Sequence, residues 1–129
     1  MMKIKPMVYQ ADRKVELLYK GRYNGYNYYI LNLGTHPTAY IEIPKGHKYY
    51  KVEYDNIDIY VHGGLTYSDN ELMGVESKNW FIGWDYAHDG DYMGFYADEM
   101  FLERPSLLSE KQWTTEEIIK DCESVIDQL

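Results

Sequence analysis

The sequence has little of several features that would place a protein in a specialised class. It contains one cysteine, Cys122, so no internal disulfide can form, which fits a reducing compartment. No apolar run approaches the ~18 residues of a membrane span. The opening residues MMKIKPMVYQ also lack the apolar core of a signal peptide. We therefore expect a cytoplasmic protein that makes no contact with a membrane.

Basic residues are scarce as well. Thirteen lysines and arginines stand against 21 acidic residues, which gives a net charge of −8. Affinity for a phosphate backbone comes from lysine and arginine side chains that neutralise it, so we expect no binding to duplex DNA. An acidic protein can also compete with DNA by mimicking its charge. The acidic residues here are spread along the chain, which does not favour mimicry of DNA.

What the sequence does contain is an ordinary globular composition with one unusual component. The chain has 129 residues, of which 45% are apolar and 26% charged, as expected for one domain with one hydrophobic core. Tyrosine accounts for 15 residues, an unusually large share. Tyrosine is a good strand residue, and it also supplies rigid contact area with a polar tip at protein interfaces. Both explanations stay open at this point.

Apolar residues alternate with a period of two between Val15 and Val61, which predicts an antiparallel meander. The apolar runs are separated by Gly21, by Asn24-Gly25 and by the stretch LGTHPT. Asn-Gly suits the left-handed positions of a tight hairpin turn. In residues 39–43, apolar side chains alternate with a tyrosine and a glutamate, which predicts a strand buried on one face only and ended by Pro44.

Two further strands are expected after a loop, residues 45–56, that contains one short helical turn. Apolar and polar residues alternate in residues 57–61, so this stretch is predicted to be a strand with His62 on its polar face. Residues Trp80–Asp85 have apolar side chains on both faces, which is typical of a central strand.

The carboxyl-terminal residues 114–129 change to a helical period and form an apolar stripe. Thr114 and Glu117 have the spacing of a capping box, in which each side chain satisfies an unpaired backbone donor at the helix start. Trp113, just before the cap, is placed to pack against the first turn. Cys122 lies on the apolar stripe and is expected to be buried and inert.

These elements predict an α+β fold. We expect a single domain, residues 1–129, in which a mainly antiparallel twisted sheet of about five or six strands carries a C-terminal amphipathic helix, residues 114–129, packed on it. Residues 1–12 are predicted to form an extended N-terminal arm.

The first candidate site is the stretch VHGGLTYSD. The simplest explanation of Gly63 and Gly64 is a sharp exit from a strand, because glycine adopts dihedrals that other residues avoid. Alternatively, their bare backbone lets a ligand approach closely, with N–H groups donating to an anion or carbonyl beside the His62 imidazole. Thr66 and Tyr67 would add hydroxyl groups to such a ligand-binding site.

The second candidate site is the stretch GWDYAHDGDY. Asp85, His88 and Asp91 are residue types that bind divalent ions, so a metal is conceivable, although the spacing does not match an EF-hand. The alternative is that Asp89-Gly90 forms a turn and the aspartates are solvated, with no cofactor at all. We add Trp84 and Asp91 to the candidate ligand-binding residues.

The interpretation that we favour joins the two stretches. Asp85 would orient His88 or His62, so that one imidazole acts as a base or as a firm hydrogen-bond donor; these three are the candidate catalytic residues. If residues 57–62 and 80–85 are adjacent antiparallel strands, His62 and Asp85 lie about 16 Å apart and cannot share a site. If the strands are parallel, or separated by a third, the side chains can converge. His47 and His36 follow glycines in turns and are expected to be solvated or capping residues.

Together the two stretches resemble a family of short proteins carried by bacteriophages, prophages and their hosts, with no established activity. The resemblance covers about Tyr40 to Leu129 and rests on HGGLTY followed by W-F-I-G-W-D-x-A-H-x-G-D, and the family often has phenylalanine where Trp84 stands. The residues of this chain that match the motif positions are His62, Gly63, Gly64, Asp85, His88 and Asp91.

The resemblance implies a phage or mobile-element protein acting in the cytoplasm of a host bacterium, and small acidic phage proteins are commonly counter-defence factors. Two hypotheses follow. In the first, the protein binds a small polar, nucleotide-like ligand in a His/Asp/Gly-Gly pocket and sequesters or cleaves it. In the second, an acidic, tyrosine-rich surface inhibits a host defence protein such as a nuclease. Whether catalysis occurs, and whether the chain forms a homo-oligomer, stay open.

Overall fold

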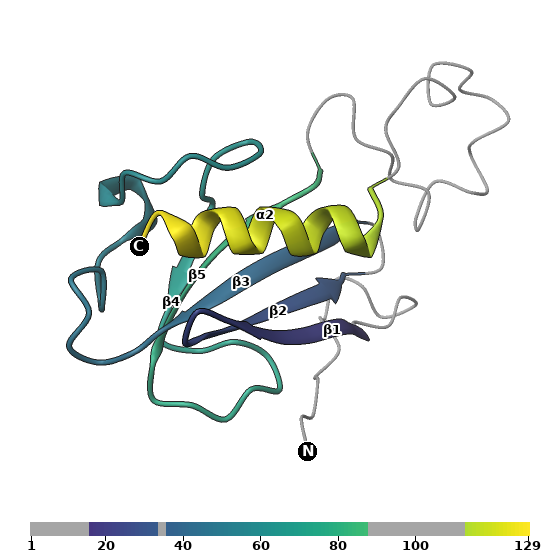
Figure 1. The fold of residues 1–129 in the computed structure, drawn as a ribbon. Helices are drawn as coiled ribbons and strands as arrows, with labels where there is room; N and C mark the ends of the chain where they lie inside the picture. The colour runs from purple at the N-terminus through teal and green to yellow at the C-terminus, as the bar shows by residue number, and fades with distance from the viewer. Residues whose placement is uncertain (1–15, 34–35, 88–112) are drawn as a thin grey trace, which may run out of the picture.

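The computed structural model of the chain describes residues 16–33, 36–87 and 113–129. These residues form one α+β domain, as predicted, in which an antiparallel five-stranded sheet carries the helix on one face (Figure 1). The strand order across the sheet is β1-β2-β3-β5-β4. The elements are β1 (Glu16–Tyr23), β2 (Tyr26–Asn32), β3 (Pro37–Ile43), the 3₁₀ turn η2 (Tyr54–Asn56), β4 (Tyr67–Asp69), β5 (Trp80–Asp85) and α2 (Thr115–Asp127).

The hairpin between β1 and β2 forms where the sequence predicts it. Asn24 and Gly25 have φ angles of 51° and 90°. Two successive left-handed residues match the right-handed twist of the flanking strands, which is why Asn-Gly is favoured at this position. Tyr23 pairs with Tyr26 across the turn.

Gly21 does not separate two apolar runs, as its position in the sequence suggested. It lies inside β1 opposite Tyr28. A Cβ atom at Gly21 would overlap the Tyr28 ring. The glycine therefore makes room for a core tyrosine within a continuous strand and does not end one.

The prediction that residues 39–43 are buried on one face only is wrong. β3 ends before Pro44 as expected, but all seven of its residues are buried. Ala39, Ile41 and Ile43 face the helix, whereas Tyr40 packs into a second hydrophobic cluster on the opposite face. Residues 70–79, far along the chain, supply part of that cover, so the alternation of β3 alone could not reveal it.

Helix α2 forms as predicted, and its start is fixed by the capping box. The Thr114 side chain accepts a hydrogen bond from the Glu117 backbone N–H at 3.2 Å, and the Glu117 carboxylate accepts one from the Thr114 N–H at 3.1 Å. The helix packs over β1, β2 and β3 (Figure 1). Its buried residues are Ile118, Cys122, Val125 and Ile126.

Residues 57–61 are not a strand, contrary to the prediction. Within the part of the chain that the structure describes, they pair with no strand. The burial does alternate, with Ile57 and Val61 in the helix-side core and Asp58 and Tyr60 exposed. The side chain of Gln128 replaces a neighbouring strand, because it binds both the N–H and the C=O of Tyr60, at 2.8 and 2.7 Å.

Two further expectations concern the chain as a whole. None of the helices in the described segments is long and apolar enough to cross a membrane. The predicted arm, residues 1–12, lies outside the described residues.

Candidate functional site

The first polar stretch and the described part of the second, residues 83–87, run beside each other along β4 and β5 at one edge of the sheet. Residues Tyr67–Asp69, immediately after the HGG motif, form β4 and pair with β5 in antiparallel register. The Thr66 N–H extends this ladder by donating to Gly83 O at 2.9 Å. The Thr66 hydroxyl then donates to Asp85 Oδ2 at 3.0 Å. Strand pairing through β4, which sequence reasoning did not anticipate, therefore joins the two motifs.

The motif itself forms a tight turn over residues 61–64, here called the HGG turn. The Gly64 N–H donates to Val61 O at 2.8 Å, and Gly63 and Gly64 have φ angles of 69° and 79°. A Cβ at Gly64 would meet open space, so the backbone conformation and not crowding requires glycine there. Because the Gly64 N–H is already bonded to Val61 O, it is not open to a ligand, and of the two glycines only Gly63 could offer its N–H.

The turn places the His62 ring against two aromatic rings. It stacks on Tyr86 with the ring centroids 5.1 Å apart and the planes at 9°, and its centroid lies 4.8 Å from that of Trp113. Tyr86 and Trp113 are themselves 4.9 Å apart. Aromatic pairs at such distances contribute about 0.5–1.5 kcal/mol beyond their buried area. We call His62, Tyr86 and Trp113 the ring cluster; it joins the HGG turn to the end of β5 and to the start of α2.

Tyr86 anchors this cluster in the core. Its side chain has no exposed surface, and its hydroxyl donates to Asp121 Oδ2 at 2.6 Å while accepting from Trp84 Nε1 at 2.9 Å. Burial, and then the Asp121 carboxylate, raise the pKa of Tyr86 above its ordinary value. The hydroxyl therefore stays protonated and fixes the ring on which His62 stacks.

Asp85 leaves β5 on the opposite side from Tyr86. Trp84 and Tyr86 both belong to the helix-side core, so strand alternation turns the intervening Asp85 away from it. Besides the bond from Thr66, the carboxylate accepts the Ala87 N–H at 3.1 Å, which caps the end of the strand. The structure thus joins Thr66 to Asp85 and His62 to Tyr86 at the same strand end, with Asp85 turned away from the helix-side core and the His62–Tyr86 stack on the side of that core.

The other predicted site residues have separate surroundings. Trp84 is buried in the core, with 1% of its surface exposed. Tyr67 faces the other side of the sheet, edge-on to Tyr40, and its hydroxyl donates to Glu71 O. Gly83 lies between these two tyrosines and has no room for a Cβ, so the glycine permits their contact.

Two of the three predicted metal ligands lie outside the part of the chain that the structure describes. His88 and Asp91 lie outside the described residues. In the described segments, no group of three or more His, Cys, Asp or Glu side chains is placed to hold a metal ion. The set Asp85, His88 and Asp91 stays a prediction.

A buried carboxylate on the other face is the polar feature that the sequence did not reveal. Glu42 is only 8% exposed and accepts hydrogen bonds from Tyr29 Oη at 2.6 Å, Ser77 Oγ at 2.8 Å and Asn79 Nδ2 at 2.7 Å. Burial raises the pKa of this carboxyl, but the hydrogen bonds outweigh it and the net pKa is below the ordinary value. Through Ser77 and Asn79, Glu42 connects the loop after β4 to strand β3 of the sheet.

The same loop encloses a shallow cleft of about 570 Å³ beside β4. Three acidic residues, Asp69, Glu71 and Glu76, contribute to its wall. The lining residues are Tyr67, Asp69, Glu71, Leu72, Met73, Gly74, Val75, Glu76 and Ser77. The cleft is distinct from the ring cluster, since it is lined by β4 and by the loop that follows it, and by no residue of the ring cluster.

Sequence reasoning missed Tyr86, on which the His62 ring stacks, and Asp121, which accepts the hydrogen bond from the Tyr86 hydroxyl. Tyr86 follows the predicted strand, and extending the alternation of Trp80, Ile82 and Trp84 by one step would have assigned it to the core. Asp121 lies beside the apolar stripe of α2, and nothing in the local sequence links it to Tyr86, 35 residues earlier.

Comparison of the chain with protein-family models, with curated proteins and with solved structures gives no match.

Proposed function

We propose that the protein binds a small polar, nucleotide-like ligand where the HGG turn meets the end of β5, and that it sequesters or cleaves this ligand. The observation that carries the proposal is the junction itself. Two stretches about twenty residues apart are joined there by the Thr66–Asp85 hydrogen bond and by the His62–Tyr86 stacking.

The chemistry of the junction suits such a ligand. His62 and Asp85 are half-buried and Thr66 is exposed, so the two sides of this strand end offer an imidazole, a hydroxyl and a carboxylate, with the half-buried Trp113 ring beside His62. Rings stack on the faces of bases. A carboxylate accepts hydrogen bonds from sugar hydroxyls or from exocyclic amino groups, and an imidazole donates to or accepts a proton from a phosphate or leaving group.

A second observation supports a functional role for this edge. Thr38 pairs with Asp85 across β3 and β5, and its hydroxyl is buried without a hydrogen-bond partner among the described residues. A buried polar atom without a partner costs about 1–3 kcal/mol. Such a cost beside Asp85 is more typical of a functional site than of a motif that serves stability alone.

The biological setting that we propose comes from the sequence motifs. Their resemblance to proteins of phages and prophages suggests an accessory protein of a mobile element, acting against a host defence system that signals or acts through a nucleotide-like molecule. Removal of such a molecule by a small acidic protein requires no contact with DNA, in agreement with the charge of −8.

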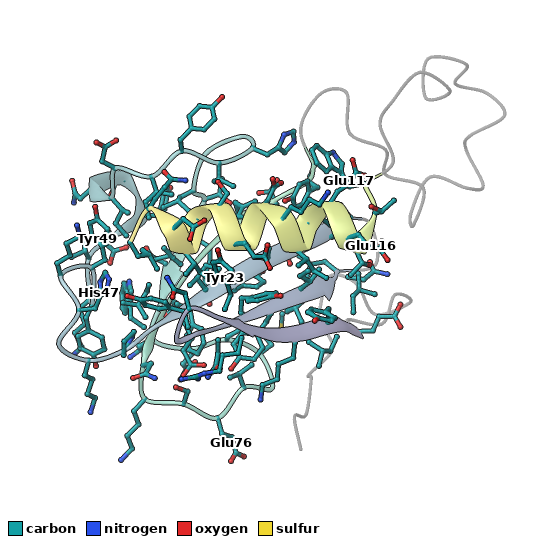
Figure 2. The ribbon with its side chains drawn as sticks, in the orientation of Figure 1. Tyr23, His47, Tyr49, Glu76, Glu116 and Glu117 are labelled. Atoms are coloured by element: carbon teal, nitrogen blue, oxygen red, sulfur yellow. The ribbon has the colours of Figure 1, made fainter. Side chains whose placement is uncertain are left out.

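The test compares two histidines in a titration calorimeter. A panel of mononucleotides, cyclic dinucleotides and nicotinamide nucleotides is titrated into the wild-type protein, into His62→Ala and into His47→Ala. Figure 2 shows His47 on the opposite side of the view from Glu117, which lies at the start of α2, four residues after Trp113, the ring that His62 contacts. His47 therefore serves as a control away from the proposed site. We expect His62→Ala to weaken binding at least tenfold, about 1.4 kcal/mol, and His47→Ala to leave it unchanged.

Chromatography of the ligand after incubation separates sequestration from cleavage, because only cleavage yields products. The proposal fails if no member of the panel binds at millimolar concentration, or if His62→Ala binds as the wild type does. It also fails if the loss in His62→Ala follows the unfolded fraction alone, since the histidine would then serve stability.

A further inference from the structure

Tyr60 has an unusual position for an aromatic residue. Its side chain is 87% exposed, whereas the other exposed large apolar or aromatic side chains of the described residues, Leu18, Tyr19 and Tyr54, are 36–40% exposed. Exposing a tyrosine to this extent forgoes the stabilisation that its burial would give. The fold has no evident use for the ring at this position.

The backbone under this ring is nevertheless held firmly. Gln128 donates to Tyr60 O and accepts from the Tyr60 N–H, and it also donates to Ser124 O at 3.2 Å within α2. The neighbouring residues Ile59 and Val61 pack into the helix-side core. An exposed ring on a fixed backbone loses less conformational entropy when it binds a partner, which is the property of a preorganised anchor.

The surroundings of Tyr60 are acidic and without basic residues. Between Lys51 and Lys78 the sequence has six acidic residues and no lysine or arginine. All six are exposed, and Glu53, Asp55 and Asp58 lie within seven positions of Tyr60, with the exposed Tyr54 among them. Residues 53–60 therefore carry three exposed carboxylates and two exposed tyrosines, Tyr54 and Tyr60.

The end of α2 adds to the same charge. Asp127 is exposed in the last turn, next to Gln128, and that turn contains no basic residue. The carboxyl end of a helix carries partial negative charge and is stabilised by cations, so Asp127 adds repulsion there, while its carboxylate accepts a hydrogen bond from Tyr23 Oη of β1 at 3.4 Å. A basic partner would remove this repulsion.

We propose that Tyr54, Asp55, Asp58 and Tyr60, together called the Tyr60 surface, form a docking site for a protein with a lysine- and arginine-rich surface. Tyr60 is the central anchor, packed into an apolar recess or under an arginine of the partner, and the carboxylates around it pair with basic side chains at the rim. The proposal does not depend on ligand binding at the HGG turn.

The charge also decides against other occupants. A second copy of the chain would bring its own net charge of −8 against the same acidic surface, and like charges across a contact cost several kcal/mol. Nucleic acid is disfavoured for the same reason, because its phosphates would meet carboxylates.

Site-specific photo-crosslinking in bacterial cells, followed by binding measurements, tests the proposal. A benzophenone amino acid replaces Tyr60 in one variant and Tyr19, an exposed tyrosine on β1, in the control. We expect a protein adduct at position 60 that is absent at position 19, and the captured protein should have an excess of basic residues. With that protein purified, Tyr60→Ala should weaken the dissociation constant roughly thirtyfold or more, as for a central anchor, and Tyr19→Ala should not.

Charge variants sharpen the result. Asp55→Asn with Asp58→Asn should slow association, and added salt should slow the wild type to a similar rate. His62→Ala should leave the affinity for the captured protein unchanged, which separates this surface from the ligand site. Each of the following outcomes would overturn the proposal: equal adducts or none at the two positions, an acidic partner, an adduct with nucleic acid or with a second copy, or a Tyr60→Ala effect below about threefold.

Discussion

The two faces of the sheet are covered in different ways. On the helix face, α2 and residues 57–61 enclose a cluster of fifteen buried residues, most of them apolar. On the opposite face a loop encloses six, and a charged residue, Glu42, holds that loop to the sheet. Hydrophobic burial therefore dominates on one face, and the other depends on hydrogen bonds to one carboxylate.

The difference shows where this small domain can carry polar groups. The helix face has enough apolar contact to hold the ring cluster and the HGG turn at its margin, where His62 is half-buried. On the loop face, polar side chains are used to attach the cover itself. The helix face thus combines most of the buried apolar surface with the ring cluster, the loop face depends on Glu42, and each face can be disturbed separately.

Removing the helix should have the largest effect. Truncation after Trp113 exposes the helix side of the core and deletes four buried side chains, each worth about 1.5–3 kcal/mol. That total approaches the entire stability of a small domain, about 5–15 kcal/mol. We expect the truncated chain to show no cooperative thermal transition by circular dichroism. A truncated chain that melts at the wild-type temperature would show that the helix is not part of the core.

Glu42→Gln should have an intermediate effect, confined to the loop face. The substitution keeps the size but weakens the bonds from Tyr29, Ser77 and Asn79, and we expect a loss of about 1–3 kcal/mol in the free energy of unfolding. The exposed Glu76→Gln, on the same loop (Figure 2), is the matched control and should lose little.

Acid should act on the same group. The folded pKa of Glu42 is below the ordinary value of 4.5, so its contribution is present above that pH and is lost as the pH falls through the folded pKa. Urea titrations of wild type and Glu42→Gln should therefore converge as the pH falls below 4.5. Curves that stay parallel would show that the charge on Glu42 does not stabilise the loop face.

Gln128→Ala should have the smallest effect. It removes two hydrogen bonds to an exposed segment, and we expect a loss of about 1 kcal/mol in the free energy of unfolding. Hydrogen exchange should accelerate at the Tyr60 amide and leave the amides of β3 protected. Unchanged exchange at Tyr60 would mean that the buried Ile57 and Val61 alone fix this segment.

The contrast between the faces also explains what the sequence could reveal. The Asn24-Gly25 hairpin and the Thr114–Glu117 cap depend on residues within four positions of each other, and both were predicted. Residues 57–61 have the alternation of a strand, but the backbone of Tyr60 bonds to the side chain of Gln128, 68 positions away. Periodicity reports which side chains are buried and not which group satisfies the backbone.

The candidate site follows the same rule. Glycines that need left-handed backbone at the HGG turn were recognisable from sequence, as was the end of β5 at Asp85. The stacking of His62 on Tyr86 and the Tyr86–Asp121 bond join three distant segments, so no local pattern could contain them. Likewise, the alternation of residues 39–43 placed Glu42 on an exposed face, because the residues that bury it and bond to it, Ser77 and Asn79, are 35 and 37 positions away.

Chemical-shift mapping with the wild-type protein tests most directly whether the HGG turn and the end of β5 form one ligand site. The nucleotide that binds most tightly in calorimetry is titrated into ¹⁵N-labelled protein. We predict saturable shifts of the amides of Gly63, Thr66 and Asp85 and of the His62 imidazole, with a common dissociation constant, while the amides around Glu42 stay unchanged. Shifts confined to the loop face, or shifts at the HGG turn that persist equally in His62→Ala, would contradict the account.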